Sequence, residues 1–306
     1  MSPVMLWVGF AVFVGVMLCL DLFVFHRTAH EVHFKEAITF SIFWIGLALL
    51  FDLGIYYFLG HQKALEFLTG YVIEKSLSVD NLFVFIVLFS YFNVTGKYQH
   101  KILFWGILGA IVIRGIFIFA GVALINRFEW IIYIFGLFLI VTGIKMAFQK
   151  DEEIHPENNP VIKLLQRFIP VHHDHEDGKF FLFKNGRWMA TSLFVVLVTV
   201  ETTDIVFAVD SIPAILAIST DPFIVFTSNI FAILGLRALY FALAGLMKMF
   251  HYLKYGLSVI LMFVGAKMIA AHFFEIPIGL ALGVIGGILA ISILCSYLFP
   301  KNETAA

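Results

Sequence analysis

The sequence has few charged residues, and this scarcity excludes most soluble folds. Asp, Glu, Lys and Arg make up 13% of the 306 residues, whereas a soluble domain has about 25%. Hydrophobic residues make up 61%, and the mean hydropathy is +0.97. A helix that spans a bilayer needs about 20 apolar residues. Because runs of that length recur along the chain, we predict an integral membrane protein.

Cysteine is also scarce. The two cysteines, Cys19 and Cys295, lie in separate apolar runs, so the sequence contains no disulfide framework and no thiolate metal motif. We interpret both as small buried hydrophobic residues. The net charge of −1 gives no general attraction to nucleic acid, and we expect no nucleic-acid partner. The 36 phenylalanines indicate packing and lipid-facing surface, and we expect no prosthetic group.

Nine apolar runs predict membrane-spanning helices. The first run is not a secretory signal, because no basic stretch precedes it and no small-residue cleavage site follows it. We therefore predict an all-α polytopic membrane helix bundle that forms one transporter domain over 1–306. A long segment, 149–187, follows the fifth span. The predicted spans are 4–25, 40–60, 64–94, 101–124, 129–148, 188–219, 222–248, 252–272 and 277–299.

Lys and Arg are distributed unevenly between the two sides of these spans. If the N-terminus lies outside, the outer loops carry only Lys63 and Arg127, against fourteen basic residues on the inner side. Positive charges favour the cytoplasmic side. We therefore predict a periplasmic N-terminus, a cytoplasmic C-terminus and a cytosolic segment 149–187. The fourteen are Arg27, Lys35, Lys97, Lys101, Lys145, Lys150, Lys163, Arg167, Lys179, Lys184, Arg187, Lys248, Lys254 and Lys301.

Two of the spans contain the same acidic pattern. The third holds "EKSLSVDN", in which Glu74 and Asp80 are six residues apart, and the sixth holds "DIVFAVDS", with Asp204 and Asp210 at the same spacing. The offset between the two pairs is 130 residues. The pattern predicts that the two spans are related by duplication.

The spans that follow also align. Arg114 in the fourth matches Arg237 in the seventh, and "GIKM" after Thr142 in the fifth matches "GAKM" in the eighth. Three helices are an odd number, so two copies of them run in opposite directions through the membrane. We predict an inverted repeat, 64–148 and 188–272, which is the architecture of many alternating-access transporters.

Charges within spans are costly, because an Asp at a helix centre costs about 2.5–3.5 kcal/mol. We count seven acids and four bases at membrane depth, away from the loops and basic helix ends, which leaves three negative charges that bound cations or protons must neutralise. The acids are Asp21, Asp52, Glu74, Asp80, Glu201, Asp204 and Asp210, and the bases are Lys75, Arg114, Arg237 and Lys267.

Residues six apart on an unbroken helix point about 120° away from each other. We therefore predict that the third and sixth spans are broken between their carboxylates, so that both acids aim at one point. Pro213 cannot donate to the Val209 carbonyl, which leaves that oxygen as a ligand. The hydroxyls of Ser76, Ser78, Thr202 and Thr203 would satisfy other backbone groups.

These oxygen ligands suit Mg, Ca and Mn. Glu201 and Asp204 are either ligands or gate and proton-path residues. A structural reading, in which the carboxylates only pair with the bases, stays open, and Asp21 and Asp52 are interpreted as interfacial or structural. The predicted metal residues are Glu74, Asp80, Asn81, Glu201, Asp204, Asp210 and Ser211, with Thr203 as a further hydroxyl. The predicted counter-ions are Lys75, Arg114 and Arg237, and Pro213 marks the helix break.

The predicted cytosolic segment contains "HHDHED", 172–177. Such a tract can sense metal, but without fixed geometry it binds metal weakly. We favour a solvated linker.

At these motifs the sequence resembles the TerC family of integral membrane proteins and, within it, the Alx branch. The text that carries the resemblance includes "LTGYVIEKSLSVDN", "FAVDSIPAI" and "TDPFIVFTSN", and the likeness extends over about 10–299. It implies a member of the lysine-exporter-like group that exports manganese across the bacterial inner membrane. It also implies that Glu74, Asp80, Glu201, Asp204 and Asp210 form the metal path.

We therefore expect a secondary transporter that exports Mn²⁺ in exchange for protons, and not an enzyme. The expected partners are the metal ion, protons and the lipid bilayer, and the oligomeric state stays open. The alternatives are an exporter of Ca²⁺ or Mg²⁺ and a membrane scaffold in metal or tellurite stress. An intramembrane aspartyl protease is disfavoured, because no Gly-x-Gly-Asp occurs and five carboxylates exceed the two that it needs.

Overall fold

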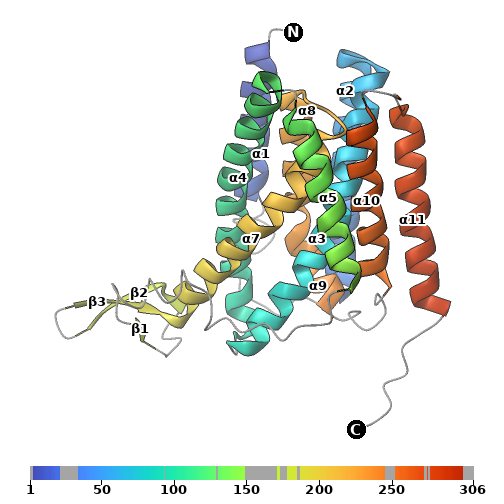
Figure 1. Ribbon diagram of the computed structural model, residues 1–306. Coiled ribbons are helices and arrows are strands. Elements are labelled where there is room, and N and C mark those ends of the chain that lie inside the picture. Colours follow the sequence, from blue (N-terminus) through green and yellow to red (C-terminus); the bar gives the residue numbers. More distant parts are fainter. Residues whose placement is uncertain are drawn as a thin grey trace.

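The chain forms a bundle of long helices that run side by side (Figure 1). The computed structural model describes residues 3–20, 34–92, 94–128, 130–148, 171–172, 178–184, 187–244, 252–271, 274 and 276–298. Seven helices in this part are long and apolar enough to cross a membrane. The helices are α1 (Pro3–Leu20), α2 (Phe34–Leu59), α3 (His61–Tyr91), α4 (Gly96–Arg127), α5 (Ile131–Phe148), α7 (Ser192–Leu216), α8 (Pro222–Leu234), α9 (Leu236–Ala244), α10 (Leu253–Ala270) and α11 (Ile278–Leu298).

The described helices confirm the prediction of an all-α membrane bundle. With α8 and α9 counted as one interrupted span, they fall in the nine predicted places. The start of α1 and the end of α11 lie at opposite ends of the bundle (Figure 1), as an odd number of spans requires. Asp21 and the tract 173–177 lie outside the described residues.

A small sheet precedes α7, and it corrects the predicted start of the sixth span at 188. Strands β1 (Val171–His172), β2 (Phe181–Lys184) and β3 (Arg187–Thr191) form a sheet in the order β1-β3-β2. β1 pairs with β3 in parallel and β2 pairs with it antiparallel. The aromatic residues in "FLFK" and "RWMAT" favour a pleated strand, so the helix begins only at Ser192.

The predicted breaks in the third and sixth spans are wrong. α3 is continuous over 31 residues and α7 over 25 residues. The Ser76 and Thr203 hydroxyls donate to the carbonyls four residues earlier, a bond that an intact helix allows. Pro213 lies in the last turn of α7, where the loss of one backbone hydrogen bond shortens the helix instead of breaking its middle.

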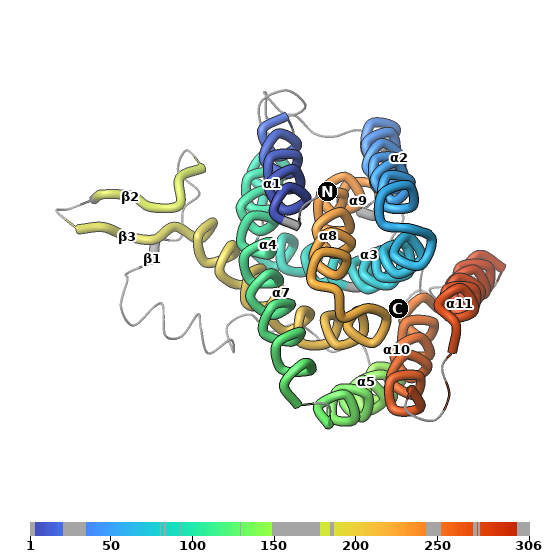
Figure 2. The backbone as a smooth tube through the Cα atoms, turned by 90° about the horizontal axis from the view of Figure 1, so that it is seen from above, coloured from blue at the N-terminus to red at the C-terminus, as the bar shows by residue number. Residues whose placement is uncertain are grey.

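The break lies in the seventh span, at Gly235, between α8 and α9. A Cβ atom on Gly235 would lie 2.7 Å from Lys75 Nζ and 3.1 Å from Trp44 Cβ. A side chain here would have to displace the Lys75 ammonium group and press against Trp44, so the close approach of α2 and α3 favours glycine at this position. α8 is the central helix of the bundle (Figure 2), and the stretch Pro222–Ala242, which comprises α8 and most of α9, is largely buried.

The helices of the two predicted repeats pack against each other. α4 contacts α7, α3 contacts α8, and α5 contacts α10. Between α5 and α10, a Cβ on Gly136 would lie 2.9 Å from the Gly265 carbonyl oxygen, and one on Gly143 would lie 2.8 Å from that of Ser258. The alignment that pairs Gly143 with Gly265 also pairs Gly136 with Ser258. Each of the two contacts is therefore the counterpart of the other. Such reciprocal packing is what a two-fold relation requires, and the duplication itself stays a prediction.

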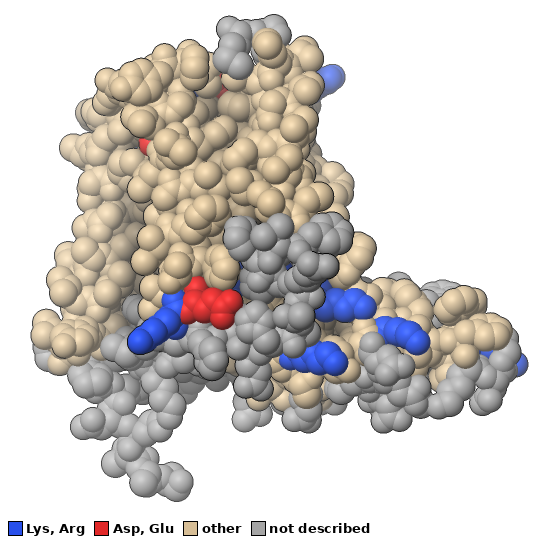
Figure 3. Space-filling view, turned by 180° about the vertical axis from the view of Figure 1, so that it is seen from behind, with Lys and Arg blue, Asp and Glu red and all other residues tan. Residues whose placement is uncertain are grey.

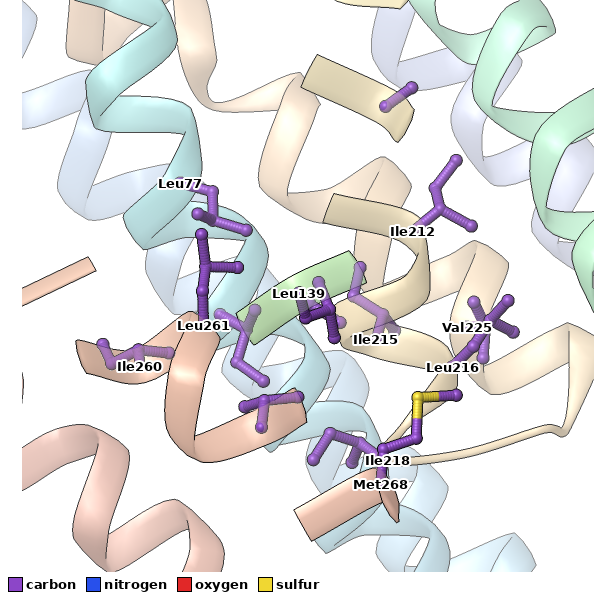
Figure 4. Close-up of a cluster of buried hydrophobic side chains, with 14 of the residues drawn as sticks. Leu77, Leu139, Ile212, Ile215, Leu216, Ile218, Val225, Ile260, Leu261 and Met268 are labelled. Carbon is purple, nitrogen blue, oxygen red and sulfur yellow. The ribbon is translucent and has the colours of Figure 1, made fainter. Parts of the chain in front are cut away.

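Apolar side chains fill the space between these helices. One cluster joins Leu77 of α3, Leu139 of α5, Ile215 of α7, Val225 of α8 and Leu261 of α10 (Figure 4). Large apolar side chains on the outer helices are exposed. On the face shown in Figure 3, a wide band carries almost no charge, and Lys and Arg gather below it. This pattern is that of a bundle surrounded by lipid acyl chains.

Candidate functional site

The charged centre of the bundle is Arg114 on α4, which is 1% exposed. Its Nη2 donates to Asp204 Oδ1 at 3.0 Å and its Nε to Asp204 Oδ2 at 3.3 Å. Its Nη1 donates to Glu74 Oε1. Asp204 comes from α7 and Glu74 from α3, and both are buried. One guanidinium therefore joins an acid from each predicted repeat, with the fork geometry that favours Arg in such pairs.

Asn229 completes this centre and was not among the predicted site residues. It lies on α8, is fully buried, and its Oδ1 lies 3.4 Å from Arg114 Nη1. Within the described residues, its Nδ2 and the Glu74 Oε2 have no hydrogen-bond partner. The sequence feature that could have identified Asn229 is the polar run Thr227-Ser228-Asn229 inside an apolar helix, because polar residues at membrane depth are usually functional.

A small cavity adjoins the centre. It leaves about 20 Å³ for the centre of a water molecule, which is room for about one water. Asp204 and Arg237 form its polar wall. The cavity extends from there toward the end of the bundle where α3 ends and α4 begins. The other lining residues are Phe85, Leu103, Gly106, Ile107, Ala110, Val200, Ile233 and Leu236.

Glu201 lies one turn before Asp204 on α7 and faces the backbone of α4. A Cβ on Gly109 would lie 2.1 Å from Glu201 Oε1, so the carboxylate occupies the space that this glycine leaves open. Its Oε2 is buried without a hydrogen-bond partner in the described part of the chain. Gly109 precedes Arg114 by five residues, about 7.5 Å along the helix. Glu201 is thus a neighbour of the Arg114 centre.

The structure places Asp210 away from Arg114. Its Oδ1 lies 3.4 Å from Thr142 Oγ1 on α5. Asn81 and Ser211 are buried, and Ser211 Oγ has no partner among the described residues. Asp80 lies on α3, but the structure does not describe its side chain. Among the described residues, no three His, Cys, Asp or Glu side chains are close enough to hold a metal ion. In this conformation, the predicted ligands are therefore spread along α3 and α7.

Two lysines within the bundle point at helix C-termini. Lys75 Nζ donates to the Ala232 carbonyl in the last turn of α8, at 3.2 Å. Lys267 Nζ donates at 3.1 Å to the carbonyl of Ala217, the residue that follows α7. The last carbonyls of a helix lack intrahelical partners and carry the negative end of its dipole. These contacts stabilise both ammonium groups inside the bundle.

A second charged cluster lies at the end of the bundle where α7 turns into α8. Lys63 Nζ lies 3.0 Å from Glu66 Oε2 and 3.0 Å from Asp221 Oδ2. The Ser219 hydroxyl donates to Glu66 Oε2 at 2.5 Å. Asp221 also caps α8 by accepting from the Phe223 N–H at 3.0 Å. The cluster ties α3 to the α7–α8 turn, and sequence reasoning did not identify it.

Comparison with known proteins decides the family of this chain. The sequence model of the protein family described as "Integral membrane protein TerC family" matches residues 59–304. The chain belongs to the TerC family. It is 53% identical over 297 residues to "Uncharacterized membrane protein STKORF319" of Myxococcus xanthus, covering 97% of this chain and 93% of that protein. No solved structure matches.

Two further relatives carry the name "Putative membrane-bound redox modulator Alx". The protein of Salmonella typhi is 50% identical over 299 residues, and that of Escherichia coli K12 is 49% identical over 299 residues. Each alignment covers 95% of this chain and 93% of the relative. This TerC-family chain is thus similar to Alx along nearly its whole length.

Proposed function

We propose that this TerC-family membrane protein is a secondary transporter that exports Mn²⁺ from the bacterial cytosol across the inner membrane. One observation carries the proposal: Glu74 and Asp204, from the two predicted repeats, meet on Arg114 in the middle of the bundle. A buried ion cluster of this kind is weak evidence for stability, and charges at membrane depth usually mark a transport path.

In the proposed mechanism, the Arg114 guanidinium takes the place of the metal ion when the site is empty. It supplies the positive charge that the two carboxylates need while no metal is bound. A divalent ion that reaches Asp204 through the adjoining cavity would compete with Arg114 for the same oxygens. Glu74, Asp204 and the Asn229 amide oxygen are hard ligands, which suit Mn²⁺, Ca²⁺ and Mg²⁺.

The acids lie at successive heights along α3 and α7. α3 and α7 run in opposite directions, so Asp80 lies six residues from Glu74 toward one end and Asp210 six residues from Asp204 toward the other. Each step is about 9 Å along a helix. We infer that the ion passes from Asp80 to the Arg114 centre and on to Asp210.

The two ends of the bundle differ around the centre. The small cavity extends from Asp204 toward the α3–α4 end, which the distribution of Lys and Arg predicts to be cytosolic. At the other end, Lys63 joins Glu66 to Asp221. This conformation fits an empty carrier closed to the periplasm. Rocking of the two repeats would open the second side. For the return half-cycle we assign proton transfer to Glu201, because it lies one turn from Asp204.

Manganese uptake into inside-out membrane vesicles, with a pH gradient imposed, tests the proposal. We expect uptake by the wild type, loss of uptake in Asp204→Asn, Asp80→Asn and Asp210→Asn, and normal uptake in the control Asp52→Asn, an acid on α2 that lies outside the proposed path. Glu201→Gln is expected to uncouple uptake from the gradient.

The same assay separates the alternatives. Uptake of Ca²⁺ or Mg²⁺ in place of Mn²⁺ would keep the transporter and change its substrate. If the wild type takes up none of the three ions, the transporter proposal fails, and the Arg114 centre would have to be interpreted as the structural core of a scaffold.

A further inference from the structure

The sheet forms an arm that leaves the bundle sideways, at the end where α3 turns into α4 (Figures 1 and 2). β3 continues into α7 with no linker, because it ends at Thr191 and α7 begins at Ser192. The arm therefore starts at the level at which a membrane-spanning helix leaves the bilayer, and it points away from the helix axes.

Contacts with α4 hold the root of this arm. Lys101 Nζ donates to the Gly178 carbonyl at 2.7 Å and lies 4.5 Å from the centre of the Phe180 ring. Gly178 has φ +67, and a Cβ there would lie 2.6 Å from the Tyr98 ring. The Thr191 hydroxyl donates to the Lys179 carbonyl at 2.7 Å. The direction of the arm is thus built into the fold.

The two faces of the β2–β3 hairpin differ. Phe183 pairs with Trp188 across the strands, and their ring centres are 5.4 Å apart. Phe181 lies on the same face, since alternate residues of a strand share a face. The exposed fractions of Phe181, Phe183 and Trp188 are 41%, 63% and 66%. Three large aromatic side chains on one face are thus exposed in the part of the chain that the structure describes.

This aromatic face continues the lipid-facing side of α7. The Phe181 ring centre lies 4.4 Å from that of Phe194, in the first turn of α7. Phe194 shares a helix face with Ile205, eleven residues later, and Ile205 is 39% exposed. The side of the helix that meets acyl chains therefore leads directly onto the aromatic side of the arm.

Basic residues surround the arm. Arg187 lies on the hairpin face opposite to Trp188, and it is exposed. Lys179, Lys97 and Lys101, at the root of the arm and on the start of α4, are exposed as well. Figure 3 shows Lys and Arg along the arm and below the uncharged band. This arrangement of aromatic and positive groups matches the chemistry of a membrane surface with anionic lipids.

We propose that the β2–β3 hairpin lies on the membrane surface, with Phe181, Phe183 and Trp188 among the lipid headgroups and the basic residues on anionic headgroup phosphates. The Trp188 indole has a polar N–H edge that suits that depth, and the Phe181 and Phe183 rings can reach the boundary between headgroups and acyl chains. The occupant of the aromatic face is therefore the lipid of the same leaflet. The proposal does not depend on which ion the protein transports.

Spin labels on the full-length protein in phosphatidylcholine–phosphatidylglycerol nanodiscs test this proposal. The labels are attached to Phe183→Cys and, as the matched control on the opposite face, to Met189→Cys, in a Cys19→Ser/Cys295→Ser background. At position 183 we expect greater accessibility to oxygen, which partitions into lipid, than to a water-soluble nickel chelate. At position 189 we expect the reverse order. Removal of phosphatidylglycerol, or Arg187→Gln with Lys179→Gln, is expected to move the label at 183 toward water.

Two outcomes would overturn the proposal. Equal nickel accessibility at positions 183 and 189 would mean that the hairpin lies in water. Protection of position 183 from both reagents would mean that protein covers it, as in an interface with a second copy of the chain. A thermal unfolding curve like that of the wild type is required for each labelled protein.

Discussion

The fourth and seventh spans align in sequence but differ in structure. α4 is one unbroken helix of 32 residues, and its Arg114 is enclosed by Glu74, Asp204 and Asn229. The seventh span is broken at Gly235, and Arg237, two residues later, lines a cavity. Two inverted repeats with identical conformations would be symmetric about the middle of the membrane. In the proposed mechanism, a difference between the two spans is what would give one side access.

Among the substitutions that test this comparison, we expect the largest effect on stability from those of the two aligned arginines. Arg114→Gln leaves Glu74 and Asp204 buried without their cation, so we expect the free energy of unfolding to fall by about 3–5 kcal/mol. We expect a smaller loss from Arg237→Gln. Denaturation by SDS in mixed micelles measures both, and Arg127→Gln, at the exposed end of α4, is the control with no expected change. Equal losses at Arg114 and Arg237 would mean that the two spans are equivalent.

The break at Gly235 is the next feature to test. Gly235→Ala places a Cβ 2.7 Å from Lys75 Nζ, and we expect a loss of about 1–3 kcal/mol in the same measurement, because the site is overpacked. Gly286→Ala in α11, where no atom lies within 4 Å of the new Cβ, is expected to be neutral or stabilising by up to about 1 kcal/mol. A neutral Gly235→Ala variant would show that the break does not depend on this glycine.

Lys75 links α3 to the end of α8. Lys75→Met removes the ammonium group from the Ala232 carbonyl, and we expect a loss of about 1–2 kcal/mol. Manganese uptake should fall as well, since the α8–α9 break would lose its partner on α3. Lys267→Met, at the end of α7, is the matched variant. If Lys267→Met reduces uptake and Lys75→Met does not, the proposed transport does not depend on the contact between Lys75 and the end of α8.

The smallest effect on stability is expected at Lys63. Its side chain is 34% exposed, so Lys63→Gln should change the free energy of unfolding by less than about 1 kcal/mol. In the proposed mechanism this variant weakens the closed periplasmic end. Cysteine labelling with a water-soluble reagent at Ile218→Cys, beside the α7–α8 turn, should therefore be faster in Lys63→Gln than in a protein that differs only by retaining Lys63. An unchanged labelling rate would mean that the cluster of Lys63, Glu66 and Asp221 does not control access at this end of the bundle.

Most of the fold was predictable from local properties of the chain. Long apolar runs indicated the nine spans. The repeated acidic spacing predicts which helices correspond, and that duplication stays a prediction. The break at Gly235 was not predictable, because it depends on how closely α2 and α3 approach α8. Pro213 was the more obvious candidate, but its place in the last turn of α7 limits its effect.

For the candidate site, too, some features follow from the sequence and others only from the tertiary structure. The amino-acid sequence alone determined that this is a membrane protein with buried carboxylates, because length, hydropathy and residue type are properties of each segment by itself. Only the tertiary structure decided that Glu74 and Asp204 meet on Arg114, that Asp210 faces α5, and that Asn229 joins the centre. A spacing of six residues sets the angle between two side chains on one helix. The packing of α3, α4, α7 and α8 decides which neighbour each side chain meets.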